Sequence, residues 1–508
     1  MKMSHDPSAY KIFLSPGLAS GCIALMTAIK DNEEATPFSY EYGYLCFRIL
    51  LLSLGASLLS RLGDRNLERA VELMQDPRYD ICLMSDIFSA QIAWSLNTLV
   101  RTPQETGCDW ALGWEPHKSH PPYDEIISRE EAKALIDILW EDRVGFLRAM
   151  RLTFIPGLAA LLFLNWRYGC LEHKYANVNS HPWKQIREIH WRCLLVITAN
   201  QDDPVSRITD HFCVLTNFDP RKRKSLFEKS KDSRAILEAY ISRLAPIDPA
   251  MYDAYHINRL SALLDLVTPN LEVAVEDLLP TLFKVTLDRL WEVVRGKNCT
   301  YDSAILGIAL TLEQLRIMFK SLRENNLTRH AIARILEELV RSSILDLIAS
   351  LFMLLDPDAE ENSKSDIANF NLIQTTNSMI YELSLSTPPD LLRDHFQDYT
   401  VSWFKICHHF DYLRLCIPDA EKHTERNRRR DKHYESCILM WENIFHDLEQ
   451  MDNLHATREL TGRCLYHQCQ DPAGQGRLGG FYICPRCLVA CYCSTRCQIG
   501  QVLLSNPL

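Results

Sequence analysis

Seven of the eighteen cysteines lie within thirty-four residues near the C-terminal end of this 508-residue sequence. Two thiolates a few residues apart on a turn can bind one metal ion together, and four thiolates complete the tetrahedral coordination of zinc. A disulfide framework is the alternative, but it needs an oxidising compartment. The cluster therefore predicts a Zn²⁺-binding unit. Six of its cysteines form three close pairs: Cys464 with Cys469, Cys484 with Cys487, and Cys493 with Cys497.

The order and spacing of these pairs narrow the type of zinc unit. From Cys484 the sequence reads CPRCLVACYCSTRCQ, a Cys-x2-Cys pair followed after five residues by Tyr-Cys-Ser-x2-Cys-Gln. This string resembles the MYND-type zinc finger, and the resemblance covers roughly residues 464–498. It implies two zinc ions in a cross-braced arrangement, in which the first and third pairs share one ion. By that resemblance Cys464, Cys469, Cys493 and Cys497 bind the first zinc, and Cys484 and Cys487 begin the second site.

The sequence departs from the family directly after Gln498. The family continues with Trp, His and a final Cys, which complete the second site. This chain instead reads IGQVLLSNPL, with Val502 at the Trp position and Ser505 at the His position. Two explanations stay open: a shortened gene model or splice form, and a finger with one complete zinc site. A filled second site needs a further ligand, for which Cys491 and His467 are the candidates.

The rest of the chain is long and rich in apolar residues. At 508 residues it exceeds the size at which one hydrophobic core keeps growing, so several domains or an elongated repeat stack are expected. Its 47% apolar and 24% charged residues are typical of a globular protein, and only eighteen glycines disfavour a turn-rich all-β fold. We expect a helical body over residues 1–455 and the finger over residues 461–508, with a candidate internal boundary near 356–366.

Hydrophobic periodicity in the body predicts helix after helix. Ser128 and Glu131 form a capping box, which opens a helix that extends to about Leu152. Further helices are expected over Pro280–Val294, Asp302–Leu322 and Thr328–Leu355. Their spacing favours an armadillo- or HEAT-like stack. An irregular helical array is the alternative, because the units do not align into a fixed repeat. The predicted fold class is thus mainly α, with a small C-terminal zinc finger.

Three segments interrupt the helical pattern, namely Thr102–Asp124, Phe218–Asp232 and Asp356–Asp366. Thr102–Asp124, which is rich in Pro and His, is expected to be a surface loop. The acidic segment Asp356–Asp366 is the best internal linker, and two basic runs, Arg221–Lys224 and Arg426–Arg430, are expected to be solvated. Beyond the second run, Trp441 and Phe445 predict a helix that leads to the finger and packs against the body.

Charge and hydropathy restrict the partners and the location. A net charge of −10 and a pI near 6.0 give no overall attraction to nucleic acid. The most apolar runs, Ile49–Leu59 and Phe154–Leu164, are shorter than the roughly 18 to 20 residues that span a bilayer, so they predict buried helices. The first residues show no apolar stretch with a cleavage site. We therefore expect an intracellular protein, in the cytoplasm, the nucleus or both, with no membrane partner.

Motifs for catalysis are missing from the sequence. It contains no HExxH, GxSxG or GxxxxGK[ST] string. MYND fingers also occur beside SET lysine methyltransferase domains, but the Asn-His-Ser-Cys-x-Pro-Asn type of signature of that domain is missing too. We therefore expect no enzyme, no catalytic residue and no cofactor besides zinc.

The family resemblance implies a protein-binding role. MYND fingers commonly bind other proteins, often through short proline-containing peptides, and Tyr482, Ile483, Val489 and Tyr492 are the candidate contacts. We interpret the chain as a zinc-dependent protein–protein interaction adaptor on a helical scaffold. A relative of SET-type methyltransferases and a nucleic-acid-binding regulator are the alternatives. The sequence does not predict the oligomeric state.

Overall fold

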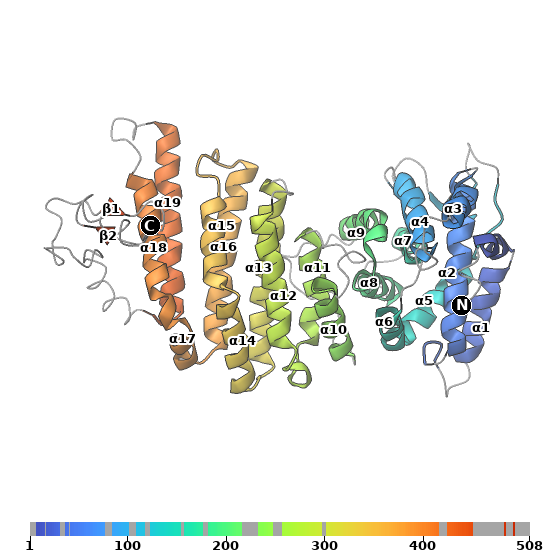
Figure 1. Ribbon diagram of the computed structural model, residues 1–508, viewed down its shortest axis with the longest axis horizontal. Coiled ribbons are helices and arrows are strands. Elements are labelled where there is room, and N and C mark those ends of the chain that lie inside the picture. Colours follow the sequence, from blue (N-terminus) through green and yellow to red (C-terminus); the bar gives the residue numbers. More distant parts are fainter. Residues whose placement is uncertain are drawn as a thin grey trace, which may run out of the picture. The chain divides into compact units, whose positions relative to one another are not determined.

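The chain is mainly α-helical, as predicted. The computed structural model describes residues 7–15, 17–30, 36–39, 41–63, 65–76, 84–100, 108–116, 122–153, 157–175, 181–215, 232–246, 257–296, 301–415, 424–450, 482–483 and 491–492 (Figure 1). Within these ranges nineteen α-helices form a helical array, and the regular β-structure is one short pair of strands.

The chain divides into two compact units, one of Met1–His256 with Asp265–Asn270 and one of Ile257–Leu264 with Leu271–Leu508. The division falls near residues 257–271, whereas the candidate boundary at 356–366 lies inside unit 2. Unit 1 contains η2 (Pro7–Leu14), α1 (Leu18–Lys30), α2 (Glu41–Leu62), α3 (Asn66–Gln75), α4 (Met84–Val100), η4 (Cys108–Leu112), α5 (Arg129–Glu141), α6 (Arg143–Leu152), α7 (Leu158–Tyr175), α8 (His181–Leu194), η5 (Ala199–Gln201), α9 (Asp202–Leu215), α10 (Ser233–Leu244), the end of α11 (Ile257–Val267) and η6 (Thr268–Asn270).

The core of unit 1 is built around α2 and α7. Helix α2 packs against α1, α3, α4 and α7, and most of the apolar run Ile49–Leu59 within it is buried, as predicted. By length and composition α2 is the one helix of the described residues that could cross a membrane, yet 61% of its most apolar window is buried inside the structure. Core helices of globular proteins share this composition, so the observation is weak evidence for a membrane span.

Two expectations for unit 1 were wrong in part. Within the predicted surface loop Thr102–Asp124, η4 is buried, since Cys108, Trp110 and Leu112 supply apolar surface that outweighs the surrounding Pro and His. The capping box at Ser128 is present, but its helix ends at Glu141 and does not continue to Leu152. The chain turns at Asp142, whose carboxylate accepts a hydrogen bond from the Phe38 amide at 2.8 Å.

Unit 2 begins with the first residues of α11 and continues as a stack of helices. Its elements are η7 (Val273–Val275), α12 (Leu279–Arg295), α13 (Tyr301–Glu324), α14 (Arg329–Arg341), α15 (Ile344–Leu354), α16 (Lys364–Ser386), α17 (Pro389–Phe396), η8 (Gln397–Tyr399), α18 (Thr400–Leu415), α19 (Glu425–Asp447), β1 (Tyr482–Ile483) and β2 (Cys491–Tyr492). The helix expected over Thr328–Leu355 is two helices, because Ser343 adopts a left-handed conformation (φ 54°) between α14 and α15.

The three long helices α13, α16 and α19 form one layer of unit 2 and run in the same direction (Figure 1). Near the end of α13, Arg316 donates to Glu382 of α16 at 3.2 Å, and the Phe319 carbonyl accepts from Ser386 at 2.8 Å. Near the start of α16, Asp358 binds the first turns of α19. Corresponding ends of neighbouring long helices therefore lie together.

This layer reveals a three-helix period. Each long helix that follows α13 is preceded by two shorter ones, α14 and α15 before α16, and α17 and α18 before α19. The long helices start at residues 301, 364 and 425, so about 60 residues separate successive units, more than the 40–47 of typical HEAT and armadillo repeats. The period lies in the helix order and the packing, not in repeated sequence.

Candidate functional site

The predicted zinc ligands lie outside the described residues. This holds for Cys464, Cys469, Cys484, Cys487, Cys493 and Cys497, and also for His467. The described backbone of this region consists of β1 and β2, which pair antiparallel with Tyr482 opposite Tyr492 and Ile483 opposite Cys491. The two cysteines of the middle pair fall in the segment between the strands, and Cys493 follows β2 directly in the sequence.

The helical part of the described chain offers no second metal centre. No group of three or more His, Cys, Asp or Glu residues that could hold a metal ion occurs among the described residues. The described cysteines form no disulfide, and Cys22, Cys193 and Cys437 are buried, as expected for small apolar core residues. Burial raises the pKa of Cys22 to about 11, so this thiol stays protonated at neutral pH.

The second basic run is held by an ion-pair clamp in unit 2. Asp358, in the segment between α15 and α16, accepts hydrogen bonds from Arg426 at 3.0 and 2.6 Å and from Arg430 at 2.6 and 2.8 Å. The hydrogen bonds from Arg426, and to a lesser extent those from Arg430, hold the pKa of Asp358 well below its usual range. Two of the arginines that sequence analysis expected to be solvated are therefore partly neutralised.

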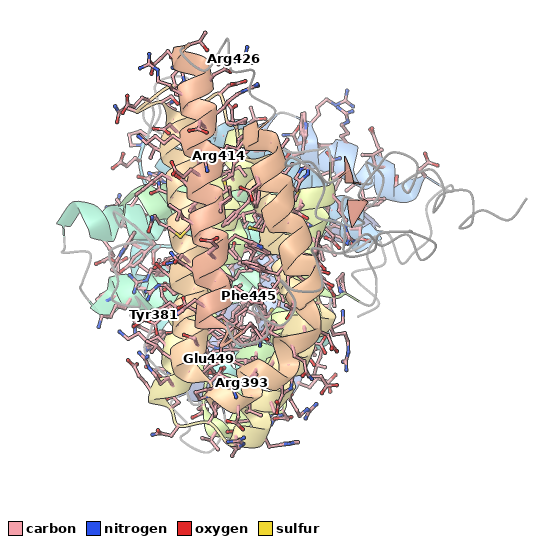
Figure 2. All side chains as sticks on the ribbon, turned by 90° about the vertical axis from the view of Figure 1, so that its left-hand side faces the viewer. Tyr381, Arg393, Arg414, Arg426, Phe445 and Glu449 are labelled. Carbon is pink, nitrogen blue, oxygen red and sulfur yellow. The ribbon has the colours of Figure 1, made fainter. Side chains whose placement is uncertain are left out.

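The other end of α19 is also anchored. The Gln450 side chain, which is buried, donates to the carbonyl oxygens of Leu392 at 3.4 Å and Arg393 at 3.1 Å, just after α16 ends. Figure 2 shows Glu449 and Arg393 at the end of α19 opposite to Arg426. In the middle, Trp441 is fully buried, so the predicted packing of this helix against the body is confirmed.

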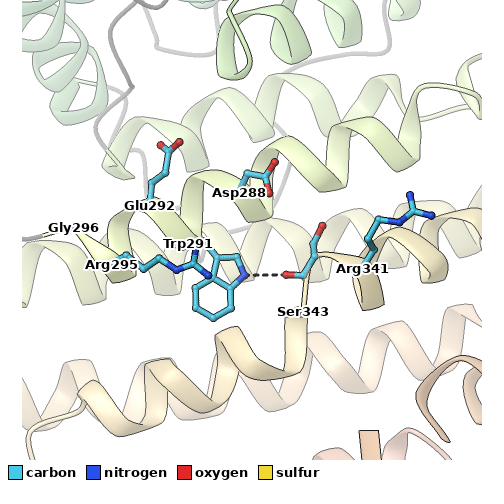
Figure 3. A pocket seen from close by; sticks show the side chains of 8 residues that line it. Asp288, Trp291, Glu292, Arg295, Gly296, Arg341 and Ser343 are labelled. Atoms are coloured by element: carbon cyan, nitrogen blue, oxygen red, sulfur yellow. Dashed lines mark hydrogen bonds between the residues drawn. The ribbon is translucent and has the colours of Figure 1, made fainter. Parts of the chain in front are cut away.

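A polar depression of about 650 Å³ lies between α12 and the joint of α14 and α15 (Figure 3). The Trp291 indole donates to the Ser342 carbonyl at 2.9 Å, and the Arg295 guanidinium lies 4.4 Å from the centre of its ring. Arg341 is paired with Glu337 at 2.6 Å. The lining holds no cysteine or histidine. The lining residues are Asp288, Trp291, Glu292, Arg295, Gly296, Arg341, Ser342 and Ser343.

Unit 1 contains a buried charge cluster centred on Arg192, whose side chain is fully buried. Arg192 donates to Asp232 at 2.6 and 3.1 Å and to Glu188 at 3.0 and 2.8 Å. Arg143 adds an ion pair to Glu188 at 3.3 Å. Burial alone lowers the pKa of an arginine, but the hydrogen bonds and charge of Asp232 and Glu188 raise that of Arg192. The cluster thus links α8 to the start of α10 through hydrogen bonds and ion pairs.

Sequence analysis did not find these sites. The clamp at Asp358, the cluster at Arg192 and the depression at Trp291 join residues 40 to 72 positions apart, and no local spacing reports such contacts. Comparison with protein-family models, with curated proteins and with solved structures finds no match to this chain.

Proposed function

We propose that this protein is a zinc-binding adaptor, which recruits other proteins through a MYND-type finger carried by a helical scaffold. The observation that carries the proposal is the spacing of the three cysteine pairs between Cys464 and Cys497. Cysteine ligands at this spacing form closed structural zinc sites. A unit of about fifty residues has too small a core to fold alone, so zinc binding and folding are expected to be one equilibrium.

Zinc content of the full-length protein tests the metal assignment. Native mass spectrometry should find one tightly held zinc per chain, bound by Cys464, Cys469, Cys493 and Cys497. Cys493→Ser should lose this zinc. Cys407→Ser, at a half-buried cysteine of α18, is the matched control and should keep it. Two equally chelator-resistant zinc ions would show that Cys491 or His467 completes the second site. A zinc-free wild-type protein would refute the assignment.

Partner capture tests the adaptor role. Proteins or short proline-containing peptides that bind the wild-type chain should be lost with Cys493→Ser, because that variant cannot fold its finger. Tyr492→Ala should weaken binding while zinc remains bound. Unchanged binding by both variants would assign recruitment to the helical scaffold. Salt-dependent binding of nucleic acid, or methyl transfer from S-adenosylmethionine, would replace the adaptor proposal by one of the two alternatives.

A further inference from the structure

One face of α16 is exposed and carries large apolar side chains. Ile367, Phe370, Tyr381 and Leu385 are 50%, 62%, 49% and 45% exposed, and Gln374 lies between them on the same face. These five positions follow one another at steps of three, four or seven residues, which keeps them on one side of a helix. We call this set of five residues the α16 stripe. The neighbouring helices α13 and α19 leave it open.

The α16 stripe carries no charge. Three charged residues lie beside it: Lys364 and Asp366 precede Ile367, and Glu382 follows Tyr381 and is bound by Arg316 and Arg323 of α13 at 3.2 and 3.3 Å. The exposed parts of the four apolar side chains amount to an apolar surface on the order of 400 Å². Patches of this size on a soluble protein often mark an interaction site. On a chain with a net charge of −10, a neutral patch is also where two copies repel each other least.

The α16 stripe has nearly the same pattern in both directions. From its start it reads an aliphatic residue, an aromatic residue and an amide: Ile367, Phe370 and Gln374. From its end it reads Leu385 and Tyr381, and the next position four residues inward is the amide Asn377. A helix with this symmetry complements an antiparallel copy of itself. Ile367 then lies opposite Leu385, and Phe370 opposite Tyr381.

We propose that the α16 stripe is a self-association surface, on which a second copy of this chain docks its own α16 antiparallel across a two-fold axis near residue 376. The same patch serves both copies, as in a closed two-fold interface. Figure 2 labels one residue of the stripe, Tyr381, beside α19. The dimer does not depend on the finger or on its partners.

The centre of the α16 stripe fits this arrangement. The carboxamide oxygen of Asn377 is buried and has no hydrogen-bond partner in the described part of the chain. Near the axis, the amide of Gln374 from the second copy lies within reach once the Asn377 side chain turns outward, and it supplies the missing donor. A polar residue in an otherwise apolar helix seam fixes the register of the two helices.

The area predicts a weak dimer. Two copies of the stripe bury roughly 800 Å², about half the size of a standard stable interface. We therefore expect reversible dimers that dissociate in the micromolar range or above. Sedimentation velocity on the full chain between about 1 and 100 μM tests this. The average mass should rise from that of the 58.7 kDa monomer towards that of a dimer.

Charge substitutions test the surface and its orientation. Phe370→Glu should abolish the concentration dependence, whereas Leu439→Glu, at an exposed apolar site of α19, should not. Phe370→Lys alone should also stay monomeric. Combining Phe370→Lys with Tyr381→Glu should restore the dimer, because antiparallel packing brings the two opposite charges together twice. Unchanged circular dichroism confirms that each variant folds.

Three results would overturn the proposal. The first is a wild-type chain that stays monomeric over the whole concentration range. The second is a dimer that survives Phe370→Glu. The third is a double variant that remains monomeric although its circular dichroism is that of the wild type, because this outcome excludes the antiparallel register.

Discussion

Removing one acid from the buried cluster at Arg192 should destabilise unit 1 strongly. In Asp232→Ala, the fully buried guanidinium loses its hydrogen bonds at 2.6 and 3.1 Å and keeps Glu188 as its acidic partner. Breaking a buried ion pair costs about 3 to 5 kcal/mol, and the remaining carboxylate places this case near 3 kcal/mol. Asp232 makes no side-chain hydrogen bond as the N-cap of α10, so no capping loss is added.

Hydrogen exchange of the full chain can measure this loss of stability in α8, the helix that carries Arg192. A loss of about 3 kcal/mol raises the opening equilibrium of α8 by about two orders of magnitude, since 1.36 kcal/mol corresponds to a factor of ten. Amides of α8 should therefore exchange about a hundred times faster. Arg234→Ala is the control and should leave them unchanged, because its ion pair with Glu238 is long (4.0 Å) and half exposed.

Replacing both partners by apolar residues should rescue stability. In Arg192→Met with Asp232→Leu, no buried charge is left without a partner, since Glu188 retains Arg143. Such replacements of buried ion pairs are often neutral or stabilising. The reasoning fails if Asp232→Ala exchanges within a few-fold of the wild type, or if the double substitution opens α8 as much as the single one.

Three further outcomes follow from unit 2 and the finger. Because the folded-state pKa of Asp358 is lowered, its ionised form stabilises unit 2 above about pH 4, and this stabilisation is lost as the pH falls. The stability of Asp358→Asn should therefore depend less on pH than that of the wild type below about pH 5, as measured by acid unfolding. Trp441→Ala should lower stability in urea unfolding by about 3 to 5 kcal/mol, and the exposed Leu439→Ala by no more than about 0.5 kcal/mol. Chelation of zinc should leave the helical circular dichroism of residues 1–455 unchanged, and a large loss would tie the body to the metal.

The helices were predictable where apolar residues recur at helical spacing. In α14, for example, Ile332, Ile335, Leu336 and Leu339 recur at steps of one, three and four residues, and the last three are buried. The breaks at Asp142 and Ser343 were not predictable, because one or two residues of turn leave the apolar pattern on either side intact. The three-helix period was also hidden, since its units share an order of helix lengths and not a sequence.

The candidate sites also divide into those that the sequence predicts and those that it does not. The cysteine pairs are a local pattern, so the sequence alone predicts the zinc ligands. The clamp at Asp358 depends on residues that meet through the stacking of α16 and α19, and a basic run looks the same in sequence whether it is solvated or bound. The surface-loop prediction failed at η4 for the opposite reason. It followed the Pro- and His-rich composition of the whole segment and gave too little weight to the few apolar residues that bury η4.

The anchoring of Gln450 limits where the proposed finger could act. Cys464 lies fourteen residues after Gln450, and a fully extended chain of this length spans at most about 50 Å. The first predicted zinc ligand therefore stays within that radius of the end of α19, and a protein held by the proposed finger would be confined near it. Confinement of this kind corresponds to an effective concentration in the millimolar range for a second contact. Even a weak contact between such a partner and the nearby end of the helical stack would then be largely occupied.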